Sequence, residues 1–260
     1  MKIEANIFFS RDYAEARSKF LEAARASSAQ ITNHIHPLRG PKGEELATDV
    51  AEFGATDASK ALFVCSATHG VEGFSGSAIQ IGLIREGLVG QLPKSTKLIL
   101  IHAINPFGFA YLRRFTEDNV DLNRNFLSPG DTRPENLGYD ALARWITPQS
   151  LSPMSEIAAL FRLILYASRH GITKTRKAVT GGQFSHPDGL FYGGDDRSWS
   201  ADTLEKIIKH HGTGVSQAVF LDVHTGLGPK AAAEIISNSP KNSEQFVRAR
   251  SIWGDVVKST

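Results

Sequence analysis

The chain has 260 residues, 41% hydrophobic and 22% charged, which is typical of a globular protein with a substantial core. Its 29 basic and 27 acidic residues give a net charge of +2, so there is no electrostatic case for nucleic acid or an anionic membrane as partner. No signal peptide, membrane span or pair of cysteines is recognisable, so we expect a cytoplasmic protein without internal disulfides.

The N-terminal region is expected to contain a helix followed by two strands. Apolar residues recur at helical spacing over residues 12–28, and Ser10 is a candidate N-terminal cap. Alternating polarity predicts a strand over 30–38, and residues 47–53 form a second strand that could pair with it.

A strand, a helix and a second strand are predicted next, and together they form a βαβ unit. Residues 61–67 are a continuous apolar run suited to a strand buried on both faces, with Cys65 as a small buried residue. A helix over 75–88 and a buried strand over 97–105 follow. This order implies parallel pairing of the two strands with a right-handed crossover.

Further elements are expected in the C-terminal half: helices over 154–170 and 201–211, strands over 218–225 and 232–238, and long loops over 127–153 and 171–200. The helix over 154–170 is apolar enough to lie deep against a sheet, and 218–225 is expected to be a third buried strand. Without a linker or internal repeat, the pattern indicates a single α/β domain over residues 1–260.

Three polar segments follow predicted strands, and parallel strands would bring them to one edge of the sheet. They are His69 with Glu72, the segment 104–126, and the segment 221–228. Ligands of open α/β sheets bind beyond the carboxyl ends of the strands. We therefore expect the functional site at this edge.

His69, Glu72 and His224 supply two imidazoles and one carboxylate, the ligand set of many catalytic zinc sites. The same donors also bind other divalent ions. Taken separately, His69 and Glu72 could be a surface pair three residues apart on a helix, and His224 a hydrogen-bonded core histidine.

The segment between the two histidines is rich in groups that recognise carboxylates. It contains adjacent arginines, Arg113 and Arg114, followed by Asp121, Asn123 and Arg124. A guanidinium group suits bidentate recognition of a carboxylate, and asparagine adds directional donors. Asp121 could accept a hydrogen bond from the second ring nitrogen of a ligating histidine.

Four motifs occur in one order: HGVE, NPFGF, DLNRNF and DVHTG. In this order the sequence resembles the zinc carboxypeptidases of the carboxypeptidase A type over about residues 60–228, and most closely a bacterial branch of uncharacterised predicted metallopeptidases in that superfamily. The aspartoacylase and succinylglutamate desuccinylase enzymes are cousins with the same pattern. The resemblance implies a mixed, mostly parallel twisted sheet with helices on both faces.

The resemblance also implies roles for the candidate residues. One zinc ion per chain would be bound by His69, Glu72 and His224, and Asn123 with Arg124 would hold the terminal carboxylate of the substrate.

Asp121 matches the position that orients the first histidine ligand. Arg114, in preference to Arg113, is expected to polarise the scissile carbonyl, and the loop 181–194 is expected to border the cleft.

The sequence departs from the family pattern at the general base. The family has a glutamate on a late strand well beyond the last histidine ligand, but only 36 residues follow His224 in this chain of 260. Glu234 and Glu244 are poor candidates for this role. We therefore expect a chain that is shortened at its C-terminus relative to its relatives, with exposed apolar surface and a tendency to form homo-oligomers.

The leading hypothesis is a zinc-dependent hydrolase of the carboxypeptidase class, in which metal-activated water attacks an amide bond next to a free carboxylate. One alternative is an N-acyl-amino-acid deacylase on the same metal site. Another is a non-catalytic protein that binds zinc or a carboxylate. A nucleotide-binding protein is disfavoured because no glycine-rich phosphate loop follows a strand.

Overall fold

The computed structural model describes residues 5–127, 130–150, 152–226, 229 and 232–259. The chain divides into two compact units, one ending at His224 and the other starting at Thr225. A single domain over the whole chain therefore stays a prediction. None of the described helices is long and apolar enough to cross a membrane.

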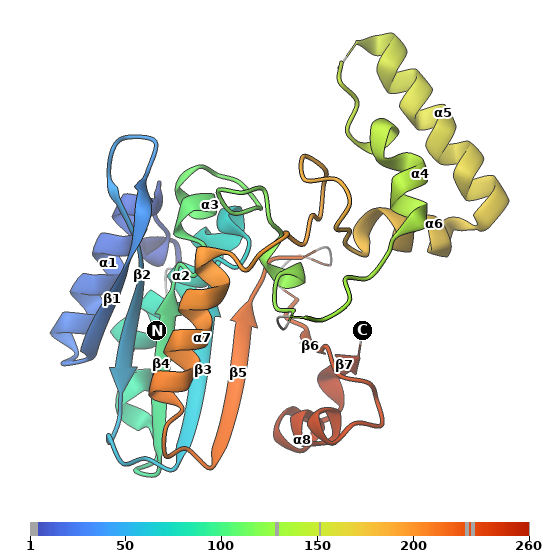
Figure 1. The fold of residues 1–260 in the computed structure, drawn as a ribbon. Coiled ribbons are helices and arrows are strands. Elements are labelled where there is room, and N and C mark those ends of the chain that lie inside the picture. Colours follow the sequence, from blue (N-terminus) through green and yellow to red (C-terminus); the bar gives the residue numbers. More distant parts are fainter. Residues whose placement is uncertain (1–4, 128–129, 151, 227–228, 230–231, 260) are drawn as a thin grey trace. The chain divides into compact units, whose positions relative to one another are not determined.

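The first unit is built on a five-stranded sheet (Figure 1). Its strands are β1 Gln30–Arg39, β2 Glu45–Phe53, β3 Lys60–Ser66, β4 Thr96–His102 and β5 Gln217–Val223. The spatial order is β1-β2-β4-β3-β5, and β2 is antiparallel to both β1 and β4. β3 is parallel to β4 and to β5, so every strand except β2 runs in one direction.

The helices of this unit are α1 Tyr13–Ala26, α2 Gly73–Arg85, α3 Pro106–Ala110, α4 Leu137–Ile146, α5 Pro153–His170, α6 Ile172–Thr180 and α7 Trp199–His211. The second unit contains β6 Ile235–Ser237, α8 Glu244–Trp253 and β7 Val257–Ser259. β6 and β7 pair in parallel as a separate two-stranded sheet.

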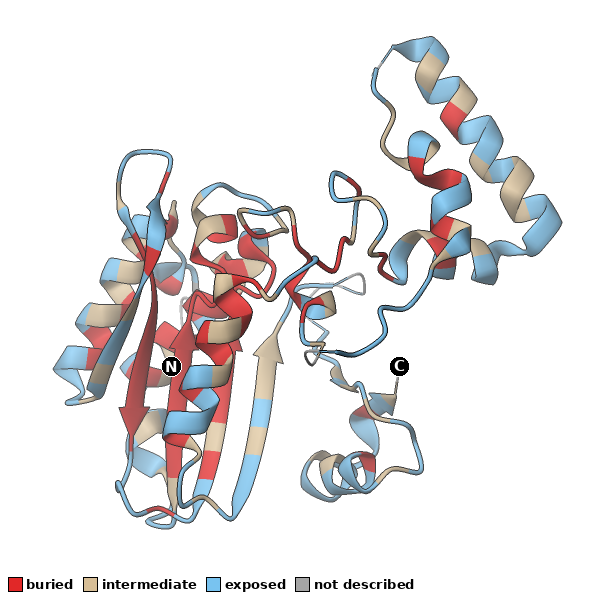
Figure 2. Ribbon diagram, in the orientation of Figure 1, coloured by how far each residue is buried: buried red, intermediate tan, exposed pale blue. Residues whose placement is uncertain are grey.

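Helices cover both faces of the main sheet, as predicted. On one face, α1 and α2 bury Phe20 and Ile81 in a core cluster that includes Val64 of β3 and Leu100 of β4. On the other face, α7 packs against a second cluster that contains Cys65. Figure 2 shows that the central strands are buried as a result. The sequences of β3 and β4 each contain a continuous apolar run, so both strands can be covered by helices on both faces. The predicted burial of Cys65 is confirmed.

The carboxyl ends of β3, β4 and β5 meet at one edge of the sheet. At this edge Ala67 and Ala103, which directly follow β3 and β4, have positive φ angles of 62° and 59° and are fully buried. The left-handed conformation is uncommon for alanine and is sustained only where the surroundings enforce it. The chain therefore turns sharply where the polar segments begin.

The N-terminal helix begins differently from the prediction. Its cap is Asp12, whose side chain accepts a hydrogen bond from the backbone N–H of Glu15 at 3.0 Å. Ser10 was predicted as the cap, but it lies too early, because a cap must be the residue directly before the first helical turn.

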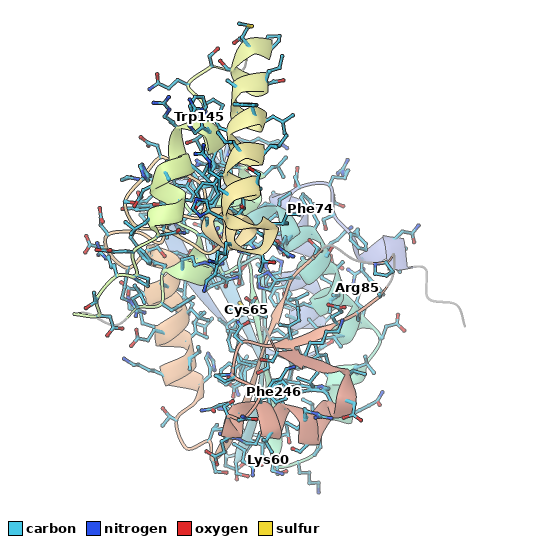
Figure 3. All side chains as sticks on the ribbon, turned by 90° about the vertical axis from the view of Figure 1, so that its right-hand side faces the viewer. Lys60, Cys65, Phe74, Arg85, Trp145 and Phe246 are labelled. Atoms are coloured by element: carbon cyan, nitrogen blue, oxygen red, sulfur yellow. The ribbon has the colours of Figure 1, made fainter. Side chains whose placement is uncertain are left out.

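The prediction that residues 154–170 lie deep against a sheet is wrong. They form α5, which packs on α4 and α6, and Ala159 is its single buried residue in the described part of the chain. The guanidinium of Arg162 in α5 lies over the ring of Trp145, 5.2 Å from its centroid. Trp145 belongs to α4 and is labelled in Figure 3. The two segments expected to be long loops contain α4 and α6.

β5 and β6 also differ from the predictions. The strand β5 forms as expected, but none of its residues is buried, because among the described strands it pairs with β3 alone (Figure 2). β6 belongs to the small sheet of the second unit and not to the main sheet.

Candidate metal centre

The first part of the site is a tight turn after β3. His69 precedes a short 3₁₀ turn, Gly70–Glu72, and this turn leads directly into α2. A Cβ atom on Gly70 would overlap the backbone of Gly108 and Phe109 in α3, so the turn can approach α3 this closely only without a side chain. The turn places Nδ1 of His69 2.9 Å from Oε1 of Glu72.

The second part of the site follows β5. His224 comes directly after the strand, and its Nδ1 lies 3.1 Å from Oε2 of Glu72. The two imidazole rings have centroids 4.9 Å apart. His69, Glu72 and His224 each offer one ligand atom within 4.8 Å of the others. The three predicted metal ligands therefore converge, although 152 residues separate Glu72 from His224.

Both imidazoles have the same orientation relative to Glu72. Each presents Nδ1 to the Glu72 carboxylate and Nε2 to an aspartate: Asp121 at 3.3 Å for His69 and Asp222 at 2.6 Å for His224. A ring nitrogen that donates its proton to a carboxylate leaves the other nitrogen available as a metal ligand.

The carboxylates change the pKa values of both histidines. Burial lowers the pKa of His224, but hydrogen bonds with Asp222 and Glu72 outweigh it and raise this pKa to about 10. Burial likewise opposes charge on His69, yet hydrogen bonds with Asp121 and Glu72 raise its pKa. The negative charge that favours protonated histidines here would also favour a bound divalent cation.

Asp121 is fully buried and lies between His69 and an arginine. It accepts hydrogen bonds from Nε of Arg114 at 3.1 Å and from the backbone N–H of Asn123 at 3.1 Å. Burial raises the pKa of Asp121, but the hydrogen bond with His69 and the charge of Arg114 lower it overall. Asp121 is thus held ionised beside the first histidine.

The arginine beside the cluster is Arg114. Its Nη1 lies 3.9 Å from Oε1 of Glu72, and its guanidinium lies over the ring of Phe191 at 5.3 Å. Arg113 instead donates a hydrogen bond to Asn119 at 3.3 Å. The structure therefore brings Arg114 to the candidate ligands.

The two remaining predicted residues, Asn123 and Arg124, contact different parts of the structure. Asn123 is exposed, and its Nδ2 lies 3.4 Å from Nε2 of His69. Arg124 donates hydrogen bonds to the carbonyl oxygens of Thr180 and Asn123. Asn123 is adjacent to the cluster, whereas the guanidinium of Arg124 contacts the end of α6.

The loop 181–194 lies against the segment that carries Asp121. The backbone N–H of Asp121 donates to the carbonyl oxygen of Tyr192 at 2.7 Å. Asn125 donates to the carbonyl oxygen of Gly193 at 2.8 Å. Phe191, with a positive φ of 58°, is the residue of this loop that lies on Arg114.

Two residues of the site, Asp222 and Thr68, were not predicted from the sequence. Thr68 donates a hydrogen bond to Oδ1 of Asp222 at 2.8 Å, and Oδ2 of Asp222 contacts His224. Asp222 lies only two residues before a predicted ligand, but its contact with Thr68 depends on the pairing of β3 with β5, which the sequence does not show. The alternative glutamates, Glu234 and Glu244, belong to the second unit, where Glu234 pairs with Lys258.

The donor set fits zinc. Zinc in catalytic sites takes three protein ligands from histidine and carboxylate groups, with ligand distances of about 2.0–2.2 Å. The three ligand atoms already lie within 4.8 Å of one another, which is close enough for one ion to contact all three. Zinc would be held by Nδ1 of His69, a Glu72 oxygen and Nδ1 of His224.

Solved structures with a similar fold include carboxypeptidase A from Helicoverpa armigera, at a TM-score of 0.53 and 16% identity over 93% of this chain and 51% of that one. Thrombin activatable fibrinolysis inhibitor also gives a TM-score of 0.53, with 12% identity over 96% of this chain and 60% of that chain. The chain thus spans about half to three-fifths of these proteins. Its first unit has the fold of the zinc carboxypeptidases.

The model of one protein family matches residues 9–260, and its description is protein of unknown function (DUF2817). The chain belongs to this family. No curated protein matches the sequence. A protein described as a succinylglutamate desuccinylase/aspartoacylase from Shewanella frigidimarina gives a TM-score of 0.38 and 18% identity over 76% of this chain and 46% of that one.

Proposed function

We propose that this protein is a zinc-dependent hydrolase of the carboxypeptidase class, which cleaves an amide bond next to a free carboxylate. One observation carries the proposal: Nδ1 of His69 and Nδ1 of His224 face the same Glu72 carboxylate, while both Nε2 atoms are held by aspartates. The carboxypeptidase fold supports a hydrolase of this superfamily.

Zinc would supply Lewis-acid activation of water and of the scissile carbonyl at this centre. The side chain of Arg114 is 34% exposed and lies beside Glu72, so it can donate to a carbonyl oxygen on which negative charge develops. Asp121 fixes the guanidinium by accepting from its Nε. The position of Arg114 therefore suits stabilisation of the oxyanion.

Recognition of the substrate carboxylate is assigned to Asn123 and Arg124. The exposed amide of Asn123 lies next to His69 and can donate to a carboxylate near the metal. Arg124 can take part only after it exchanges its hydrogen bond with the carbonyl oxygen of Thr180. We expect substrate binding to turn this side chain toward the cluster.

Metal content is the first test. Purified protein is stripped with a chelator, incubated with zinc and measured by elemental analysis, and we expect one zinc ion per chain. His224→Ala should lose this ion. His186→Ala is the matched control, because His186 also contacts an aspartate, Asp140, outside the cluster and should retain the ion.

Turnover then decides the reaction. An N-blocked dipeptide with a free C-terminus, the same dipeptide amidated, and an N-acetyl amino acid are compared. Hydrolysis of the free dipeptide alone supports the carboxypeptidase class, whereas hydrolysis of the N-acetyl amino acid alone identifies a deacylase. Stoichiometric zinc without turnover of any of the three compounds identifies a binding protein and refutes the hydrolase.

A further inference from the structure

Each of the two candidate histidine ligands contacts an aspartate. The sequence predicted Asp121, which contacts His69, but it did not predict Asp222, which contacts His224. Asp121 is fully buried and is itself fixed by Arg114 and a backbone N–H. Asp222 is on β5, two residues before His224, and its Oδ2 lies 2.6 Å from Nε2 of that ring. The two aspartates therefore contact equivalent ring atoms of different histidines.

The second aspartate also links two strands. Its Oδ1 accepts a hydrogen bond from the hydroxyl of Thr68 at 2.8 Å. Thr68 directly precedes His69, and in the β3–β5 pairing Asp222 is opposite Cys65. The path Thr68–Asp222–His224 thus connects the turn that carries the first ligand to the strand that carries the second.

This link matters because the two strands are supported unequally. β3 lies between β4 and β5 and is largely buried, whereas β5 has no buried residue and pairs with β3 alone among the described strands. The imidazole of His224 has a side-chain exposure of 32%, compared with 5% for His69. Packing therefore constrains His224 weakly, and polar contacts must set its ring orientation.

We propose that Asp222 is a positioning residue that fixes the His224 ring with Nδ1 toward the metal, and that the Thr68 hydroxyl sets the position of Asp222. The carboxylate accepts the proton of Nε2, which selects the tautomer whose Nδ1 lone pair can bind zinc. This inference rests on the proposed zinc site and assigns to Asp222 a role toward that site.

The test measures zinc affinity by competition with a chelator of known affinity at fixed pH. Asp222→Ala should weaken zinc binding by about 10- to 100-fold, the usual effect of removing a carboxylate behind a ligating histidine. Thr68→Val should weaken it about tenfold or less, because Asp222 remains, and Thr68→Ser should restore the wild-type value. Asp140→Asn is the matched control, since it alters an aspartate–histidine contact outside the cluster and should leave the affinity unchanged.

A second readout separates positioning from general destabilisation. In the zinc-loaded protein, nitrogen-15 NMR should show the His224 ring protonated at Nε2 in the wild type and a changed ring signal in Asp222→Ala. Thermal unfolding of the metal-free variants shows whether Asp222→Ala still folds. If it does not, the comparison of Thr68→Val with Thr68→Ser tests the proposal by itself.

The outcomes distinguish the two proposals. A wild type that binds no zinc overturns both the zinc site and the role of Asp222. A wild type that binds one zinc, with the same affinity in Asp222→Ala and Thr68→Val, overturns only the positioning role. Graded loss in these variants with an unchanged Asp140→Asn control establishes it.

Discussion

The two histidines of the candidate metal centre come from differently built regions. His69 follows β3, a strand with sheet neighbours on both sides, and the turn that carries it packs against α3. His224 follows β5, whose residues are at most half-buried. Both ligands contact carboxylates, but packing also fixes the first region, whereas the second region depends mainly on its polar contacts.

Because of this difference, substitutions in the two regions should have different effects on the stability of the fold. A buried turn fixes its ligand through sterics, and a substitution there disturbs the fold. An exposed strand keeps its ligand in place through a few polar contacts, and a substitution there changes the ligand with little effect on the fold. The following predictions test this contrast.

The largest effect is expected at the turn after β3. Gly70→Ala should lower the free energy of unfolding by about 4 kcal/mol or more and abolish zinc binding, because the new Cβ overlaps the α3 backbone. Urea denaturation and zinc stoichiometry measure the two effects. Gly90→Ala is the control, since nothing lies near its added Cβ and the change should stay within about 0.5 kcal/mol. Equal stability of both variants would refute steric fixation of the turn.

The two strands can be compared directly through a pair of phenylalanines. Phe63 of β3 and Phe220 of β5 are opposite each other, with ring centroids 6.3 Å apart, yet they are 2% and 41% exposed. Phe63→Ala should cost about 3–5 kcal/mol, because it leaves a cavity in the core. Phe220→Ala should cost about 1 kcal/mol or less. Chemical denaturation of both variants measures the ratio, and similar losses would mean that β5 is covered in solution.

The buried end of β4 predicts a dependence on pH. Burial lowers the pKa of His102 from 6.5 to about 4, while Phe20 stacks on its ring and Ser77 contacts its Nε2. The unfolded chain binds this proton at a higher pH than the folded chain, so stability is full above pH 6.5 and falls as the pH drops toward 4. The loss from this group should reach about 3 kcal/mol.

His102→Gln isolates that contribution, because glutamine does not titrate and can still contact Ser77. Unfolding free energies of both proteins between pH 7 and pH 4 measure it. The wild type should lose more stability than the variant, and parallel curves would show that His102 is not the responsible group.

The smallest effect is expected on α5. Ile157 is 66% exposed, so Ile157→Ser should change the free energy of unfolding by no more than about 0.5 kcal/mol. Leu142→Ala, in the buried side of α4, should cost about 2–5 kcal/mol as the matched comparison. A large loss in Ile157→Ser would show that this face of α5 is covered, as in the homo-oligomer that the sequence led us to expect.

Local patterns were sufficient for the centre of the fold. The continuous apolar runs of β3 and β4, and the helical pattern between them, predicted the βαβ unit because strands buried on both faces need no alternation. The same reasoning failed for α5 and β5. Periodicity identifies an apolar face, but it does not say whether another element packs on that face.

The candidate ligands and one of the two residues that orient them could be identified from residue types and motif order, whereas the other could not. Asp121 was predicted because it belongs to a recognisable motif. Asp222 was missed because its importance depends on the β3–β5 register, which brings it within reach of Thr68.

The sequence by itself determined which side chains can bind a metal and at which strand ends they occur, because residue type and strand length are local properties. The tertiary structure alone decided that Nδ1 of both imidazoles faces Glu72. The physical reason is that a ring orientation depends on hydrogen bonds with carboxylates, and only folding brings the partner of His69 next to it across 52 residues of chain.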